Sequence, residues 1–135
     1  MAEKDIVEFI LGGIKFEYDK QKNQSNIEKH GISFQSAARV FFDYDRIEYY
    51  DEKHSTDEDR YDTIGDVSAG DSPKVAVGNV SQIIGFRSQI LFVAYTERTK
   101  IDSAGKREEA IRLISARMAT NFERRLYYGE LYFLD

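Results

Sequence analysis

The sequence has no cysteine among its 135 residues and no long apolar run. Without cysteine the chain cannot form a disulfide, a thiolate metal site or a thiol nucleophile, and this composition fits a reducing cytoplasm. No apolar run approaches the roughly 20 residues of a membrane span. The start, MAEKDIVEFILGG, lacks the basic leader and long apolar stretch of a signal peptide. We therefore expect a cytoplasmic protein without membrane contacts.

The composition is that of a folded domain. Hydrophobic residues make up 41% of the chain and aromatic residues 13%, which is enough to build a core at this length. We predict a single domain that spans residues 1–135.

Charge is distributed unevenly along the chain. The net charge of −5 by itself argues against a nucleic-acid-binding protein. However, residues 43–71 hold eleven acidic and three basic side chains, a net charge of −8, whereas residues 98–125 hold eight basic and four acidic ones, a net charge of +4. One interpretation of this pattern is a molecule with an acidic side and a basic side, the basic side formed by the C-terminal third. The other is that both charged segments are ordinary solvent-exposed faces.

Two helices are predicted in the first third of the chain. A short strand at residues 16–19 ends in an acidic cap and leads into a polar helix at residues 20–29. Gly31 is placed to close that helix in the left-handed conformation. Ser33 then caps a second helix at residues 34–42, whose apolar residues recur at helical spacing and should face the core: Phe34, Ala37, Ala38 and Phe41.

An antiparallel sheet and a last helix are predicted for the rest. Branched and aromatic residues indicate strands at 46–50, 60–64, 90–96 and 111–115. Residues 66–89 look like an insertion, and Gly78-Asn79 within it favours an extra hairpin formed by residues 74–77 and 80–84. Thr120 and Glu123 form a capping box at the start of a third helix, with Phe122 and Leu126 on its apolar face. The fold class is therefore α+β, with two N-terminal helices, an antiparallel sheet and a C-terminal helix.

Four stretches read together carry a resemblance to a known family. They are FEYD, KHGISF, DEKHSTDEDRYDTIG, and AYTER followed by LISARMATNFERRLY. In this order, from Phe16 to Tyr127, the chain resembles the BrnT family, the toxin half of a type II toxin–antitoxin pair. Tyr18 stands where members of that family commonly have tryptophan.

The resemblance implies a fold similar to RelE-type ribonucleases and cleavage of messenger RNA without a metal ion. It also implies inhibition by a ribbon-helix-helix antitoxin similar to BrnA, with operator DNA bound only through that antitoxin. The alternative is a non-catalytic interaction protein that keeps the toxin fold and the antitoxin-binding surface. The overall acidity and the additional lengths at residues 66–89 and 100–109 favour this alternative, whereas the pair of Arg98 and Arg117 favours the ribonuclease.

Arginines are the candidates for stabilising charge on a phosphate. Arg98 and Arg117 each end a strand-like run, and adjacent antiparallel strands could bring their guanidinium groups onto one face, forked onto a phosphate. The other interpretation is that Arg98 pairs with Glu97 or a surface acid.

Further candidates extend this surface. Arg60, Arg124 and Arg125 are predicted to contact RNA, and Tyr127 could stack a base or order a proton. Tyr127 could equally be a half-buried packing aromatic.

The two histidines are the candidates for proton transfer. His30, beside Lys29 and Gly31, could exchange a proton with RNA, or it could stabilise the helix end by donating to terminal carbonyls. His54 lies among acidic residues, but no second histidine stands at ligand spacing. We therefore expect neither a metal ion nor another cofactor.

Overall fold

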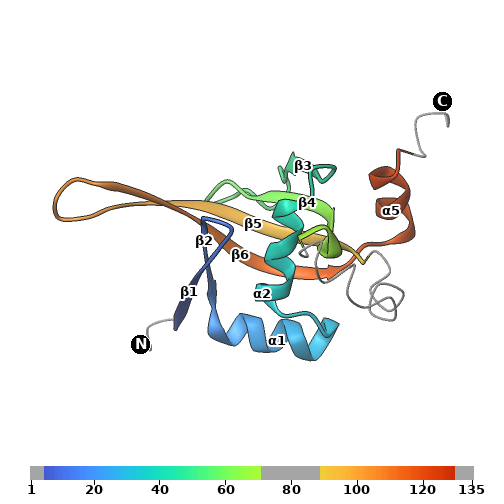
Figure 1. Ribbon diagram of the computed structural model, residues 1–135, viewed down its shortest axis with the longest axis horizontal. Coiled ribbons are helices and arrows are strands. Elements are labelled where there is room, and N and C mark those ends of the chain that lie inside the picture. The colour runs from blue at the N-terminus through green and yellow to red at the C-terminus, as the bar shows by residue number, and fades with distance from the viewer. Residues whose placement is uncertain (1–4, 71–88, 130–135) are drawn as a thin grey trace.

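The structure is a computed structural model that describes residues 5–70 and 89–129 (Figure 1). Six strands form one sheet in the order β1-β2-β6-β5-β4-β3. Neighbouring strands are antiparallel except β2 and β6, which are parallel. The strands are β1 (Ile6–Leu11), β2 (Ile14–Asp19), β3 (Ile47–Tyr50), β4 (Tyr61–Asp66), β5 (Ile90–Ile101) and β6 (Arg107–Met118). The α+β class is confirmed.

A β-hairpin, and not a helix, begins the described chain. β1 and β2 pair over their full lengths around Gly12 and Gly13, whose φ angles are 56° and 81°. A two-residue turn with both φ angles positive matches the twist of a hairpin, and glycine adopts it without steric cost. The predicted order, with two helices before the sheet, is therefore not confirmed: two strands come first, and only the strand at residues 16–19 was predicted. The β-branched run before the double glycine was the signal for β1.

The helices follow this hairpin. In α1 (Lys20–His30) the Asp19 carboxylate accepts the N–H of Gln21 at 2.8 Å, and Gly31 ends the helix at φ 70°. The predicted helix at 34–42 is α2 (Phe34–Ala37), continued by the 3₁₀ turn η1 (Ala38–Phe42). The three predicted helix ends, at Asp19, Gly31 and Ser33, are confirmed.

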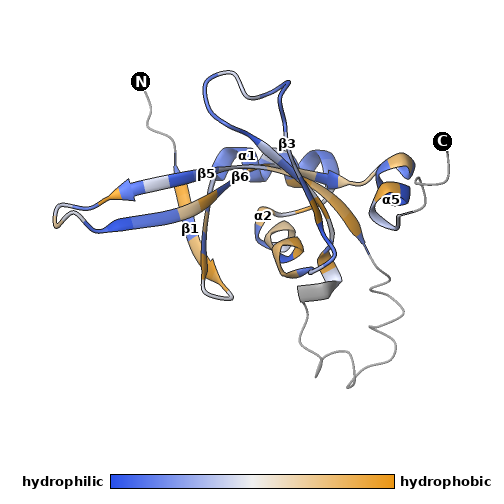
Figure 2. Cartoon of the chain, turned by 90° about the horizontal axis from the view of Figure 1, so that it is seen from above, coloured by the Kyte–Doolittle hydropathy of each residue, from blue (hydrophilic) through white to orange (hydrophobic). Residues whose placement is uncertain are grey.

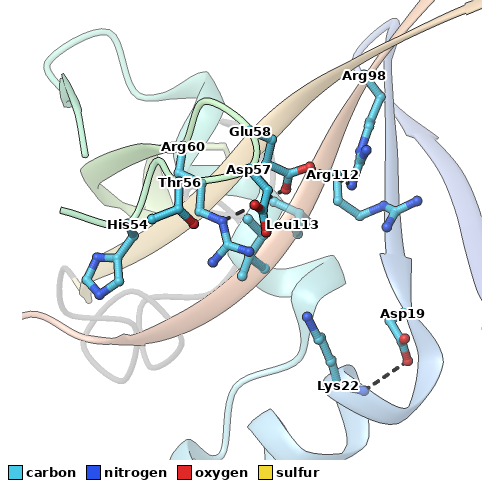
Figure 3. Close-up of a pocket in the computed structure, with 11 residues that line it drawn as sticks. Asp19, Lys22, His54, Thr56, Asp57, Glu58, Arg60, Arg98, Arg112 and Leu113 are labelled. Atoms are coloured by element: carbon cyan, nitrogen blue, oxygen red, sulfur yellow. Dashed lines mark hydrogen bonds and ion pairs between the residues drawn. The ribbon is translucent and has the colours of Figure 1, made fainter. Parts of the chain in front are cut away.

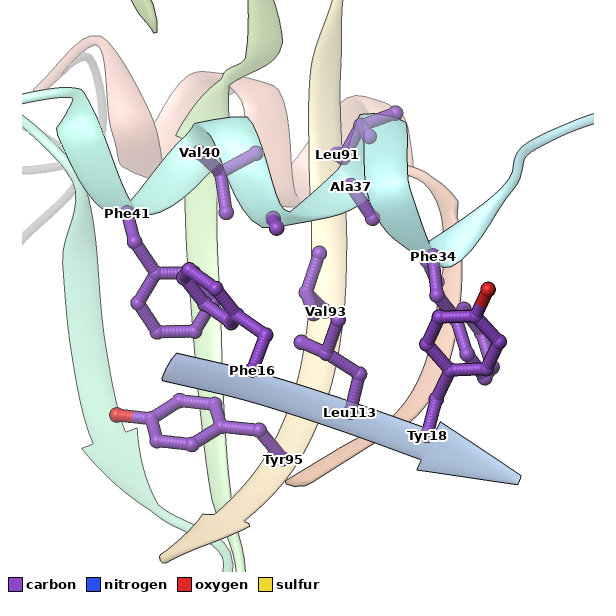
Figure 4. Close-up of a cluster of buried hydrophobic side chains, with 12 residues drawn as sticks. Phe16, Tyr18, Phe34, Ala37, Val40, Phe41, Leu91, Val93, Tyr95 and Leu113 are labelled. Atoms are coloured by element: carbon purple, nitrogen blue, oxygen red, sulfur yellow. The ribbon is translucent and has the colours of Figure 1, made fainter. Parts of the chain in front are cut away.

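The core lies between the sheet and α2 with η1 (Figure 4). Side chains from β2, β5 and β6 meet those of α2 and η1 there, and aromatic rings contact one another edge-on or tilted. The four residues predicted to face the core are all buried, and the fully buried part includes Phe16, Phe34, Ala37, Ala38, Val40, Val93 and Ala116.

β5 and β6 are much longer than predicted. Their paired register continues to Ile101 opposite Arg107, and the resulting arm projects beyond the rest of the sheet (Figure 1). The arm is exposed near its tip, where Ile101 is 72% accessible. The predicted hairpin at residues 74–84 lies outside the described residues. A second 3₁₀ turn, η2 (Val67–Gly70), follows β4.

α5 (Asn121–Tyr127) is the predicted C-terminal helix, and its Thr120–Glu123 capping box is confirmed. Phe122, predicted on the apolar face of this helix, has a side chain that is 63% exposed. α5 is held instead by polar contacts with Arg117 and Asp43. None of the described helices is long and apolar enough to cross a membrane.

Candidate active site

A polar cleft of about 220 Å³ opens between the start of α1, the strands β5 and β6, and the loop of residues 51–60 (Figure 3). Figure 2 shows this loop between β3 and β4 as hydrophilic. Most of the side chains that line the cleft are charged: Asp19, Lys22, Asp57, Glu58, Arg60, Arg98 and Arg112, with His54 at the rim.

Hydrogen bonds fix the loop that forms one wall. At its base the N–H of Asp51 donates to the carbonyl of Arg60 at 2.8 Å. The N–H of Arg60 donates to the hydroxyl oxygen of Ser55 at 2.8 Å, and the Thr96 hydroxyl of β5 donates to the Asp59 carbonyl at 2.6 Å. Because backbone groups at three points are bound, the loop presents its side chains from a defined position.

Strand register brings Arg98 and Arg112 into one cleft. Thr96 pairs with Arg112 across β5 and β6, and Arg98 lies two residues further along β5. Alternate residues of a strand share a face, so the two arginines are diagonal neighbours.

Arg98 and Arg60 share a carboxylate. The Arg98 guanidinium lies 3.0 Å from Glu58, and Arg60 Nε lies 3.8 Å from the other oxygen of the same group. Arg98 Nε is buried without a hydrogen-bond partner among the described residues. The interpretation that Arg98 pairs with a surface acid is therefore confirmed, and the acid is Glu58. The pair leaves guanidinium donors free for a second anion.

Arg112 is held from behind by Glu17. The parallel register of β2 and β6 sets these two residues side by side, and Arg112 Nε donates to the Glu17 carboxylate at 2.6 Å. Glu17 is fully buried, and Lys100 approaches its other oxygen at 3.1 Å. A buried carboxylate between two cations fixes the guanidinium of Arg112 toward the cleft.

His54 is oriented by Asp51. Its Nδ1 lies 2.9 Å from the Asp51 carboxylate, which also accepts the backbone N–H of His54 at 3.1 Å. Burial raises the pKa of Asp51, but hydrogen bonds from Asp62 and His54 outweigh it, so that the pKa lies below its usual value. Nε2 has no hydrogen-bond partner in the described part of the chain, and the imidazole is 60% exposed. A carboxylate on Nδ1 assigns its proton there and leaves Nε2 free for a ligand.

The predicted pair of Lys29 and His30 lies elsewhere. Both side chains are exposed in the last turn of α1, as expected if His30 stabilises the end of the helix. His30 follows Lys22, which lines the cleft, by about two helical turns, roughly 12 Å along the axis. The structure therefore does not bring His30 to Arg98, and its catalytic role stays a prediction.

The predicted fork of Arg98 and Arg117 is wrong in its geometry. Arg117 pairs with Phe92, six residues before Arg98 on β5, which separates the two arginines by roughly 20 Å along the strand. Arg117 instead binds Glu123 of α5 through two hydrogen bonds of 2.7 and 2.9 Å. Its guanidinium lies 4.1 Å from the centre of the Phe92 ring. These contacts are those of a residue that anchors α5.

The candidates on α5 surround that anchor and do not line the cleft. The Tyr127 hydroxyl donates to Asp43 at 2.5 Å, and burial together with this hydrogen bond raises the pKa of Tyr127. Tyr127 is half-buried, which agrees with the packing interpretation. Arg124 and Arg125 stand on the same helix. Of the predicted RNA contacts, only Arg60 is in the cleft.

Several cleft residues were not predicted from the sequence, among them Lys22, Glu58 and Arg112, and His54 was not connected with Asp51. A carboxylate three residues before a histidine in a turn-rich loop was the available signal for that pair. The position of Arg112 depends on the parallel pairing of β2 with β6, which has no local signature.

One known family matches part of the chain. The family described as "Ribonuclease toxin, BrnT, of type II toxin-antitoxin system" matches residues 18–79, a little under half of the chain. The resemblance to BrnT toxins is confirmed. The matched part contains Lys22 and the whole loop of residues 51–60, whereas Arg98 and Arg112 lie beyond it. No curated protein matches the chain.

Proposed function

We propose that this chain is the toxin of a type II toxin–antitoxin system, a RelE-like endoribonuclease that cleaves messenger RNA in the cytoplasm without a metal ion. A ribbon-helix-helix antitoxin neutralises it and connects it to operator DNA. The observation that carries the proposal is the cleft itself, where three arginines surround a space beside a histidine whose Nε2 is free. The family match supports the ribonuclease and toxin parts.

The arginines supply the charge that RNA cleavage requires. Attack of a ribose 2′-oxygen on phosphorus adds negative charge to the phosphate oxygens, and preorganised donors that face those oxygens lower the barrier. Arg98 and Arg112 are already fixed by Glu58 and Glu17, so binding a phosphate costs them little reorganisation. A cationic cleft can stabilise this charge without a divalent ion.

His54 supplies the proton transfer. In the reaction the O2′–P bond forms as the P–O5′ bond breaks, which leaves a 2′,3′-cyclic phosphate and a 5′-hydroxyl. Neutral His54 takes the 2′-hydroxyl proton at Nε2, or the imidazolium returns a proton to the leaving O5′. Asp51 stabilises the imidazolium in either role.

Expression of the chain should arrest growth, and the purified protein should cut single-stranded RNA to products with 2′,3′-cyclic phosphate ends. Coexpression of a ribbon-helix-helix partner that binds the chain should relieve the arrest. The measurements are growth curves and end-group analysis of the RNA. Tight antitoxin binding without any RNA cleavage would instead show that the chain is a non-catalytic interaction protein.

Cleavage should be insensitive to chelation. Because the cleft offers guanidinium and imidazole groups to the phosphate, EDTA should change the initial rate by less than about twofold. The check is cleavage of one RNA oligonucleotide with EDTA and with added Mg²⁺ at constant ionic strength. Loss of activity in EDTA that a divalent ion restores would refute the metal-independent mechanism.

A further inference from the structure

A buried carboxyl group lies behind the His54–Asp51 pair. Asp62 is only 4% exposed and pairs with Tyr49 across β3 and β4. The N–H of Asp51 donates to the carbonyl of Arg60, so Asp51 and Asp62 are diagonal neighbours on one face of this hairpin. Asp51 in turn accepts the Nδ1–H of His54 at 2.9 Å. The three side chains therefore follow one another from the interior of the sheet to the rim of the cleft.

The surroundings of Asp62 favour a neutral, donating carboxyl group. On β3, Tyr49 is the strand partner of Asp62. Two charged groups also act on Asp62: Arg117 of β6, which is already bound to Glu123 of α5, and Asp51, which lies on the loop with His54. Asp62 Oδ1 has no hydrogen-bond partner among the described residues. Burial, followed by the hydrogen bond and charge of Asp51, raises the pKa of Asp62 to about 7. Two adjacent carboxyl groups share a proton in this way because ionising both would place two negative charges side by side, which costs free energy.

We infer that Asp62 is a positioning residue for the proposed ribonuclease: its protonated carboxyl donates to Asp51 and thereby holds Asp51 on Nδ1 of His54. The backbone does not fix the orientation of the imidazole, because the His54 ring is largely exposed and would rotate freely without Asp51. With Asp51 fixed, the imidazole keeps one tautomer and presents Nε2 to RNA. Only this last step rests on the proposed function.

The sign of the pH effect follows from the direction of the shift. An unfolded aspartate ionises near its ordinary pKa, whereas Asp62 in the folded protein does so near 7. Between these values the folded state binds more protons than the unfolded state, so the contribution of Asp62 to stability falls as pH rises through this window. Above pH 7 the ionised Asp62 also repels Asp51 and no longer donates to it.

Two substitutions separate hydrogen bonding from titration. Asp62→Asn keeps a donor toward Asp51 at every pH, and Asp62→Leu fills similar volume without a donor. We expect Asp62→Asn to cleave RNA within about twofold of wild type at pH 6, and its rate relative to wild type to rise at least threefold by pH 8. Asp62→Leu should be about tenfold slower than wild type at pH 6, because His54 is no longer held in place, and this difference should narrow by pH 8, where wild-type Asp62 is ionised and no longer donates to Asp51. A constant ratio between Asp62→Asn and wild type from pH 6 to 8 would overturn the inference.

The state of the imidazole gives a readout that does not depend on activity. The chain has two histidines, so His30→Gln assigns their nitrogen resonances without ambiguity. We expect ¹⁵N shifts to report the Nδ1–H tautomer of neutral His54 in wild type and in Asp62→Asn, and a mixture of tautomers in Asp62→Leu. The same tautomer in all three folded proteins would show that Asp62 does not position His54. If wild type cleaves no RNA, the proposed function fails, while these spectra still decide the role of Asp62.

Discussion

Replacing His54 by glutamine is expected to slow RNA cleavage about a hundredfold, the usual scale for losing a general acid or base. Glutamine retains a hydrogen-bonding side chain that can reach Asp51, but it cannot exchange a proton near pH 7. Since the imidazole is 60% exposed, the melting temperature should hardly change. The measurement is the single-turnover rate on one RNA substrate, together with thermal unfolding of the same preparation.

His30→Gln is the matched control. His30 is exposed in the last turn of α1, and its substitution should change the cleavage rate by less than about twofold. A small loss of stability would fit a cationic side chain at a helix C-terminus. The reverse result, with His30→Gln inactive and His54→Gln active, would place proton transfer at the C-terminal end of α1 and refute the cleft as the catalytic centre.

Local features of this fold could be read from the sequence because each depends on a few neighbouring residues. Asp19 and Thr120 cap helices, and Gly31 ends one, through hydrogen bonds that span no more than four residues. Such signals survive in any tertiary context. The α+β class followed from them together with the strand-forming runs.

Features that depend on distant pairing could not be predicted in the same way. β2 lies in the interior of the sheet because it pairs in parallel with β6, about ninety-five residues away, and this pairing joins Glu17 to Arg112. Likewise, Arg98 and Arg117 both end strand-like runs, yet the β5–β6 register places only one of them in the cleft. A site assembled from several strands is fixed by register, and register is a property of the whole sheet.

Replacing Arg98 by alanine should reduce cleavage by a factor of about 100 to 1,000, the range observed when one donor to a developing anion is removed. The side chain joins the loop wall to β5 through Glu58, so the loss removes a phosphate donor and also leaves Glu58 less neutralised in the cleft. Uncompensated carboxylate charge repels the RNA backbone, which adds to the effect on substrate affinity. Arg98→Lys keeps the positive charge without the planar fork and should recover only part of the rate.

Arg117→Ala tests the same kind of substitution outside the cleft. It removes both hydrogen bonds to Glu123 and the contact with the Phe92 ring, so the free energy of unfolding should fall by about 2 kcal/mol. The rate per folded molecule should stay within about threefold of wild type, since Arg117 lies roughly 20 Å along the strand from Arg98. Cleavage at single-turnover conditions, corrected by the folded fraction from urea unfolding, distinguishes the two effects. An Arg117→Ala protein that is fully folded but as inactive as Arg98→Ala would show that the catalytic surface extends to α5, because loss of anchoring alone cannot abolish chemistry in a folded molecule.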